Sequence, residues 1–368
     1  MTGRQRLLAI IVLALLCGHG AQADRVSRKT IEAVTAIDVG LGVEQLQRRA
    51  ALPWALSQAL VYSGVRVGYA DLCVVSGWSG GFSYAPEAPA GDSLLRGTLS
   101  RGVEMYGKRL EFFAWPEART EEERIYAARA AWEFILSNIA ADRPVISDYG
   151  AGGLFYGYDT SRDEPVAYFD TLGPSFGAVR RTAFSDGFRR DFRELAVIVD
   201  GGSPVDAQAL LVSTMAGLLV KAHETGDGDR PAGIRGMSAL AADLLDNTHD
   251  WTATVMWLAD PLAQITESRL CTAAYLRRRA ELLEPPAREH VLAAADLYNQ
   301  AFDFWCRRWD ATWGGANGDE RNPALRLAEP GRRDSMAGYV HQALGAELLA
   351  LSEIGRAIAA LEGSGETP

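Results

Sequence analysis

The chain has 368 residues, of which 48% are hydrophobic and nine are tryptophan, a composition that fits packed cores and argues against disorder. Its net charge of −10 and its lack of a basic tract argue against nucleic acid and anionic membrane surfaces as partners. The sequence contains no CxxC or HExxH motif and no complete calcium-binding loop, so we expect no metal and no cofactor.

The N-terminus, residues 1–23, predicts a cleavable secretory signal. Arg4 and Arg6 precede an apolar run over 7–16, and Ala21-Gln22-Ala23 forms a small-x-small cleavage site. The run is too short to span a bilayer, which takes about 20 residues, and no later stretch is long and apolar enough. We therefore expect an exported mature chain of 345 residues, periplasmic or secreted, whose charge falls from −10 to −12 because Arg4 and Arg6 are removed.

Three cysteines would remain after cleavage: Cys73, Cys271 and Cys306. An odd number in an oxidising compartment predicts one disulfide and one leftover thiol. We expect the pair Cys271–Cys306, because both would lie on antiparallel helices joined by a short turn. Straight helices would leave an axial offset of about 10 Å, against a limit of about 7 Å between Cα atoms, so this geometry is marginal.

The first half of the mature chain mixes helices with short strands. We expect helices over 48–62 and 120–141, the second opened by a capping box of Thr120 and Glu123. Expected strands cover 143–147, 154–158, 166–169 and 195–199, the middle two forming a hairpin across the turn-rich segment 159–165.

The composition becomes helical, with much Ala and Leu, after residue 200. Ser203 suits an N-cap and Pro204 a first helical position. Helices are expected over 204–223, 236–246, 262–283, 287–312 and 336–361. The sequence thus predicts an α+β domain over 24–200 and an all-helical domain over 204–362.

Two possible nucleophiles lie in the first domain, Ser79 and Cys73. Gly77-Trp78-Ser79-Gly80-Gly81 matches the GxSxG pattern of a nucleophile elbow, but Pro86 and Pro89 follow, so the helix that such an elbow needs cannot begin there and a glycine-rich turn is favoured. Cys73 lies in an apolar setting, where burial makes a thiol inert. Residues 24–200 contain no histidine, so a base would have to come from the helical half, which carries His223, His249, His290 and His341.

Several segments, taken in order, resemble one known family. Residues 55–64 look like the helix that carries the nucleophile of papain-like double-glycine-leader peptidases. Residues 76–82 are similar to an SG-x-x-F stretch in the related N-terminal domain of the butirosin biosynthesis protein H family. Further segments resemble the core strands and C-terminal helices of that group, so that the likeness covers roughly 48–310: 143–146, 154–159, 167–174, 268–269, 273–277 and 293–298.

The resemblance implies a papain-like fold without its peptidase chemistry. In that family a Cys opens the first helix, a His begins the strand that leads into Gly-Tyr, and an Asp or Asn follows on the next strand. Counted along this chain, the places of Cys and His fall near Ala51 to Pro53 and near Ala151, and only Asp170 matches its role.

We therefore expect an exported, catalytically degenerate protein that binds a peptide, an amine metabolite or a glycan in the former peptidase cleft. The resemblance places Trp78, Ser79, Tyr149, Tyr156 and Asp170 near that cleft, and the catalytic candidates are Cys73, Ser79 and Asp170. One alternative is an amide-forming or amide-cleaving acyl-transfer enzyme with a relocated nucleophile. Another is a structural partner protein that acts through its helical half. The enzyme alternative requires a histidine of the helical half within hydrogen-bond reach of Cys73 or Ser79.

Overall fold

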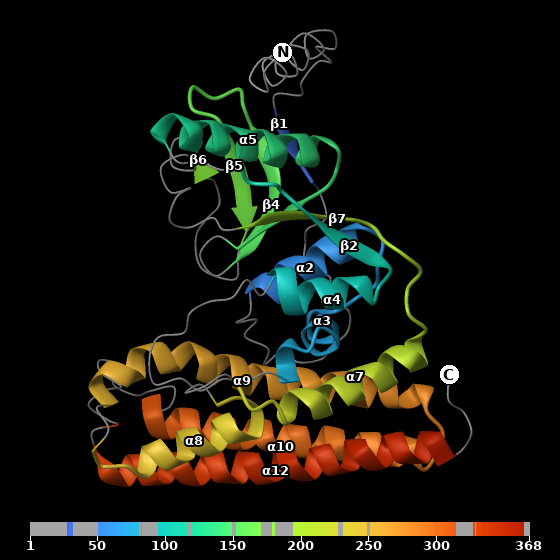
Figure 1. The fold of residues 1–368 in the computed structure, drawn as a ribbon, viewed down its shortest axis with the longest axis vertical. Helices are drawn as coiled ribbons and strands as arrows, with labels where there is room; N and C mark the ends of the chain where they lie inside the picture. Colours follow the sequence, from blue (N-terminus) through green and yellow to red (C-terminus); the bar gives the residue numbers. More distant parts are fainter. Residues whose placement is uncertain are drawn as a thin grey trace, which may run out of the picture.

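A computed structural model describes residues 28–31, 51–80, 82, 95–116, 120–148, 152–170, 179–180, 194–226, 231–248, 251–313, 327 and 329–363. The expected signal, residues 1–23, lies outside the described residues, as do Tyr149, Ala151 and His249. The described chain is a mixed α/β structure with an antiparallel sheet at one end and a group of long helices at the other (Figure 1).

Within the described residues the sheet has seven strands, and every pairing between them is antiparallel. Its strands are β2 (Lys108–Phe112), β7 (Leu195–Asp200), β3 (Val145–Ser147), β4 (Gly153–Asp159), β5 (Val166–Asp170) and β6 (Val179–Arg180), in that spatial order. Strand β1 (Arg28–Thr30) pairs with the second half of β4, beyond the point where β3 pairs with the first half. The expected hairpin of β4 and β5 is confirmed, whereas β1, β2 and β6 were not expected.

Helices cover both faces of the sheet (Figure 1). Helix α5 (Glu121–Ala140) packs on one face against side chains such as Phe155 and Phe169, and helix α2 (Ala51–Tyr62) packs on the other against Ile146 and Leu154. This division follows from the alternation of side chains along each strand. The expected capping box of α5 is confirmed: Thr120 Oγ1 accepts from Glu123 N at 3.2 Å, and Glu123 Oε2 accepts from Thr120 N at 2.8 Å.

All five helices expected in the second half are present, with different bounds. They are α7 (Ala207–Ala222), α8 (Gly233–Leu245), α9 (Trp251–Arg279), α10 (Ala287–Trp313) and α12 (Pro330–Gly363). The N-cap of α7 is Asp206 and not Ser203, because the Asp206 carboxylate accepts from Gln208 N at 2.9 Å and Ala209 N at 3.2 Å. Helix α9 begins at Trp251, whereas the expected helix begins at residue 262, directly after Pro261. Proline usually interrupts a helix, but here it lies inside one.

A layer of short helices joins the sheet to the long helices. It contains α3 (Tyr69–Val75), the 3₁₀ turn Trp78–Gly80 and α4 (Ser100–Glu104), which follows a π-helical turn over Leu95–Leu99. Every residue of α3 is buried, and α3 packs against α2 on one side and against α9 and α7 on the other (Figure 1). One hydrophobic core therefore runs from Leu56 of α2 through Leu72 of α3 to Tyr275 of α9 and Ile354 of α12.

Candidate functional site

The N-terminus of α2, the start of β4 and the end of β5 meet in the structure. Gly152 has a φ of +100°, and a Cβ atom there would lie 2.5 Å from Leu52 Cγ and 3.2 Å from Leu52 N. A Cβ atom on Gly153 would lie 2.4 Å from the carbonyl oxygen of Asp170. These are the three segments to which the resemblance assigns nucleophile, base and orienting carboxylate.

Of the three family positions, only the third has a side chain capable of acid–base chemistry, that of Asp170. The opening of α2 is Ala51-Leu52-Pro53, and β4 is preceded by Gly152. A papain-like reaction needs a thiolate and an imidazole in contact. The side chains that the sequence supplies at the first two places are apolar or absent.

Two tyrosines lie beside Asp170. The rings of Tyr156 and Tyr168 are stacked, with centroids 6.1 Å apart and planes 29° apart. Partial burial raises the pKa of Tyr156, and the nearby Asp170 carboxylate and Tyr168 raise it further. Tyr156, Tyr168 and Asp170 thus form one group, the tyrosine–aspartate cluster, in which Asp170 is exposed and both tyrosines are partly exposed.

A strand irregularity and the pleat of β5 build this cluster. The register of β4 and β5 shifts between Phe155 and Gly157, so that Tyr156 has no direct partner on β5 and stands at a bulge. Bulges redirect side chains and are common beside functional sites. On β5, Phe169 points to the core under α5, so Tyr168 and Asp170 lie together on the opposite face.

The sequence analysis identified Tyr156 and Asp170 but missed Tyr168. The signal for Tyr168 was its position two residues before Asp170 on an expected strand, because such residues share one face. Arg162 links Tyr168 to Asp159. Its Nη2 donates to Tyr168 Oη at 3.5 Å, and its Nε donates to Asp159 Oδ2 at 3.0 Å.

Trp78 and Ser79 do not join the cluster. Both are buried against the long helices, and Trp78 belongs to the core that α3 shares with α9. The Ser79 hydroxyl donates to the carbonyl of Cys73 at 3.1 Å. A helix, α3, precedes Ser79 where a nucleophile elbow has a strand, and the 3₁₀ turn directs the hydroxyl back onto that helix. The structure therefore does not bring these two residues together with Tyr156 and Asp170.

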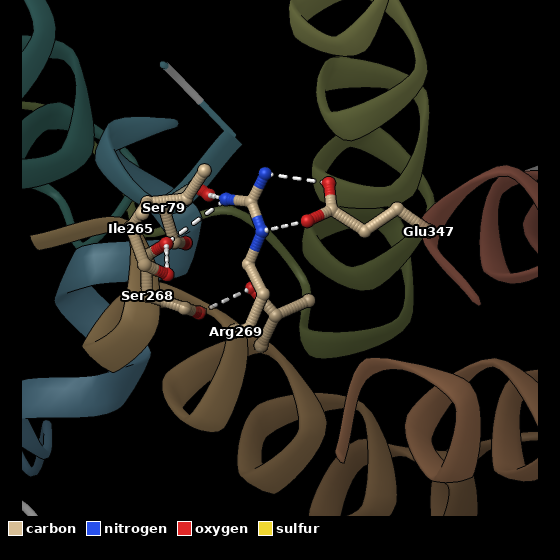
Figure 2. Close-up of polar contacts among 6 residues, drawn as sticks. Ser79, Ile265, Ser268, Arg269 and Glu347 are labelled. Atoms are coloured by element: carbon tan, nitrogen blue, oxygen red, sulfur yellow. Dashed lines mark hydrogen bonds and ion pairs between the residues drawn. The ribbon is translucent and has the colours of Figure 1, made fainter. Parts of the chain in front are cut away.

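The carbonyl of Ser79 belongs to a buried ionic group, which Figure 2 shows in close-up. Arg269 Nη1 donates to this carbonyl at 2.7 Å, and the same guanidinium pairs twice with Glu347, through Nε at 2.7 Å and Nη2 at 2.6 Å. Burial by itself would lower the pKa of Arg269, but the Glu347 carboxylate outweighs this effect and the pKa is raised. The group ties the 3₁₀ turn to α9 and α12.

A small cavity lies beside this ionic group. It has a volume of about 10 Å³ and is lined by Ser79, Gly80, Leu218, Arg269, Tyr298 and Glu347, among others. A cavity of that size has room for about one water molecule. The Arg269–Glu347 pair is therefore a junction between parts of the fold and not a substrate pocket.

Cys73 is fully buried in α3, as the apolar setting predicts, and it lies against Cys271 of α9. The expected disulfide between Cys271 and Cys306 is wrong: none of the three described cysteines forms a disulfide in the structure, and Cys271 lies against Cys73 of α3. Burial raises the pKa of the Cys271 thiol well above its usual value, and the neighbouring Cys73 thiol adds to this effect.

None of the described histidines bonds to Cys73 or Ser79. His290 Nδ1 lies 2.7 Å from Glu353 Oε2. His223 ends α7, and both it and His341 are exposed. His223, His290 and His341 therefore do not supply the base that the acyl-transfer alternative requires at either residue.

Gly152→Ala tests the close approach of α2 to β4. Alanine at φ = +100° costs about 1–2 kcal/mol of backbone strain, and its Cβ would also collide with Leu52. Gly64 is a matched control, since it has a φ of +87° and nothing lies within 4 Å of an added Cβ. In urea unfolding we expect Gly152→Ala to destabilise the protein by about 1–3 kcal/mol more than Gly64→Ala. Equal losses would contradict the contact.

The described residues limit what else the site can be. Among them, no group of three or more His, Cys, Asp or Glu side chains is arranged to hold a metal ion. Within the same ranges, no helix combines the length and the apolar character that crossing a bilayer requires. No family model matches this chain, and no curated protein is significantly similar to it.

Proposed function

We propose that this protein is an exported, catalytically degenerate papain-like protein that binds an amine-bearing ligand at the former peptidase cleft. The observation that carries the proposal is the tyrosine–aspartate cluster, where two stacked phenol rings stand beside the Asp170 carboxylate. The meeting of Leu52, Gly152 and the end of β5 supports the papain-like part of the proposal, because it occurs where the resemblance places the catalytic residues.

The chemistry of the cluster favours an ammonium group over a neutral sugar or an anion. A cation over an aromatic ring gains about 0.5–1 kcal/mol at an exposed site. A carboxylate accepts several hydrogen bonds, and a charge-assisted one is about twice as strong as a neutral one. An anion would meet both the Asp170 charge and a chain of net charge −10. The ligand class is thus an amine metabolite or a peptide that presents an ammonium group.

Calorimetric titration tests this proposal with benzylamine and spermidine as probes and benzyl alcohol as the neutral analogue of benzylamine. We expect both amines to bind and benzyl alcohol to bind at least about tenfold more weakly, because it lacks the charge. Asp170→Asn should weaken benzylamine binding by a similar factor. Asp163→Asn makes the same change of charge in the exposed β4–β5 turn and should leave the affinity unchanged.

Two results would contradict the proposal. Benzyl alcohol could bind as tightly as benzylamine, which would show that the charge is not recognised. Alternatively, Asp163→Asn and Asp170→Asn could weaken binding equally, which would indicate attraction by the net charge of the chain and not a site at Asp170.

A further inference from the structure

The interface between α3 and α9 places two thiols against each other. Cys73 projects from α3 and Cys271 from α9, and both are fully buried in the same hydrophobic core. The two thiols are hydrogen-bond partners, and the Tyr69 side chain also bonds to Cys73. Two cysteines nearly 200 residues apart in the sequence therefore face each other across the junction of sheet and long helices.

Two arginines of α9 hold the segment around Cys73 against this helix. Asp71, two residues before Cys73, accepts from Arg278 Nη2 of α9 at 3.0 Å. On the other side of Cys73, the Ser79 carbonyl accepts from Arg269 of the same helix at 2.7 Å. These contacts join the α3 segment to α9 both before and after Cys73.

We infer that Cys73 and Cys271 form a disulfide when the chain folds under oxidising conditions, and that this bond links the sheet-bearing half to the long helices. To form it, the sulfur atoms move from hydrogen-bonding range to the length of an S–S bond, about 2.05 Å. In the folded protein the two side chains project from α3 and α9, which pack against each other. Cys306 remains the leftover thiol.

The oxidation needs a disulfide as co-reactant, such as oxidised glutathione or a thiol–disulfide oxidoreductase. One cysteine thiolate attacks the oxidant, forms a mixed disulfide and releases one reduced thiol. The second cysteine thiolate then attacks the protein sulfur of that mixed disulfide and releases the other reduced thiol. In total the protein loses two protons and two electrons, and one glutathione disulfide becomes two molecules of glutathione.

Burial determines when this reaction takes place. In the folded, reduced protein both thiols are closed off from solvent, and burial raises the pKa of Cys271, so attack on an external disulfide is slow. The oxidant therefore reaches Cys73 and Cys271 during folding, before α3 closes on α9. This inference does not depend on the proposed ligand, and its test does not use ligand binding.

The test is to refold the purified mature chain, residues 24–368, from the denatured, reduced state with either oxidised glutathione or dithiothreitol. After alkylation and digestion without reductant, the oxidised sample should yield a cross-linked peptide that contains Cys73 and Cys271, with Cys306 alkylated. Because the closed loop is long, the oxidised wild type should melt about 5–10 °C above the reduced one. Cys306→Ser should keep this difference, and Cys271→Ala should lose it.

Other results would overturn the inference. A Cys271–Cys306 cross-link in the refolded wild type would do so, as would three alkylated cysteines in folded protein. Cys306→Ser serves as the second variant, because it does not change either residue of the buried pair. Once Cys306 is replaced, the mature chain can form only the disulfide Cys73–Cys271. If this variant folds but shows no cross-link and no oxidant-dependent rise in melting temperature, the inference is wrong.

Discussion

Glu347→Leu should destabilise the protein by about 3–5 kcal/mol, because it leaves the Arg269 guanidinium buried without its counter-charge. The side chains of Arg269 and Glu347 are only 4% and 5% exposed, and two hydrogen bonds join them. The adjacent cavity has room for about one water molecule, which could replace a hydrogen bond to the guanidinium but not its counter-charge. Urea unfolding followed by tryptophan fluorescence measures the loss as a shift of the midpoint.

An exposed pair on neighbouring helices provides the control. Arg277 Nη2 lies 2.6 Å from Asp296 Oδ1, but the two side chains are 49% and 75% exposed. Asp296→Leu should therefore cost only about 0–1 kcal/mol. The double variant Arg269→Met with Glu347→Leu should recover more than half of the loss from Glu347→Leu, but not all of it, since the Ser79 carbonyl then loses its donor. A loss of less than about 1 kcal/mol for Glu347→Leu would contradict the burial of the pair.

Phe155→Ala should cost about 3–5 kcal/mol by opening a cavity between the sheet and α5. The Phe155 side chain is fully buried, and its ring lies 4.6 Å from that of Phe169. Tyr126→Ala also removes an aromatic ring, but from the outer surface of α5, where Tyr126 is 66% exposed, so its effect should stay within about 0.5 kcal/mol. Urea unfolding of both variants compares them, and equal losses would contradict the placement of α5 over this face.

The elements that the sequence predicted correctly are those with strong local signals. The capping box of Thr120 and Glu123 marks the start of α5 by itself. The β4–β5 hairpin follows from two apolar runs around a turn-rich segment, and the long helices follow from apolar periodicity. In each case the information lies within a few residues of the element.

Helix α3 was not predicted because its causes lie far away in the sequence. It has seven residues, among them the β-branched Val74 and Val75, and local propensity gives such a segment little helical preference. Its first turn is held by Asp71, which accepts from Gly68 N at 3.1 Å and also pairs with Arg278 of α9. Because the packing of α3 on α9 was not predicted, the contact between Cys73 and Cys271 and the burial of Ser79 could not be predicted either.

The candidate site was predictable in part. Counting along the resembling segments put the three family positions near Ala51 to Pro53, near Ala151 and at Asp170. Ala151 lies outside the described residues, but its neighbour Gly152 contacts Leu52, and Gly153 contacts the Asp170 carbonyl. Tyr168 could have been found from the pleat of β5. The stacking of Tyr156 on Tyr168 could not, because it depends on a bulge that no residue pattern in β4 predicts. The resemblance placed Trp78 and Ser79 near the cleft, whereas in the structure both are buried between α3 and the long helices.

The most direct test of the proposed cleft is an NMR titration of protein labelled with ¹³C in its tyrosine rings, with benzylamine added to millimolar concentration. Tyr156→Phe and Tyr168→Phe assign the two ring signals, and Tyr126→Phe assigns that of an exposed tyrosine on α5. Our account predicts that the Tyr156 and Tyr168 signals shift together along one saturation curve while the Tyr126 signal stays in place. Shifts confined to other tyrosines, or no shift of Tyr156 and Tyr168, would contradict it.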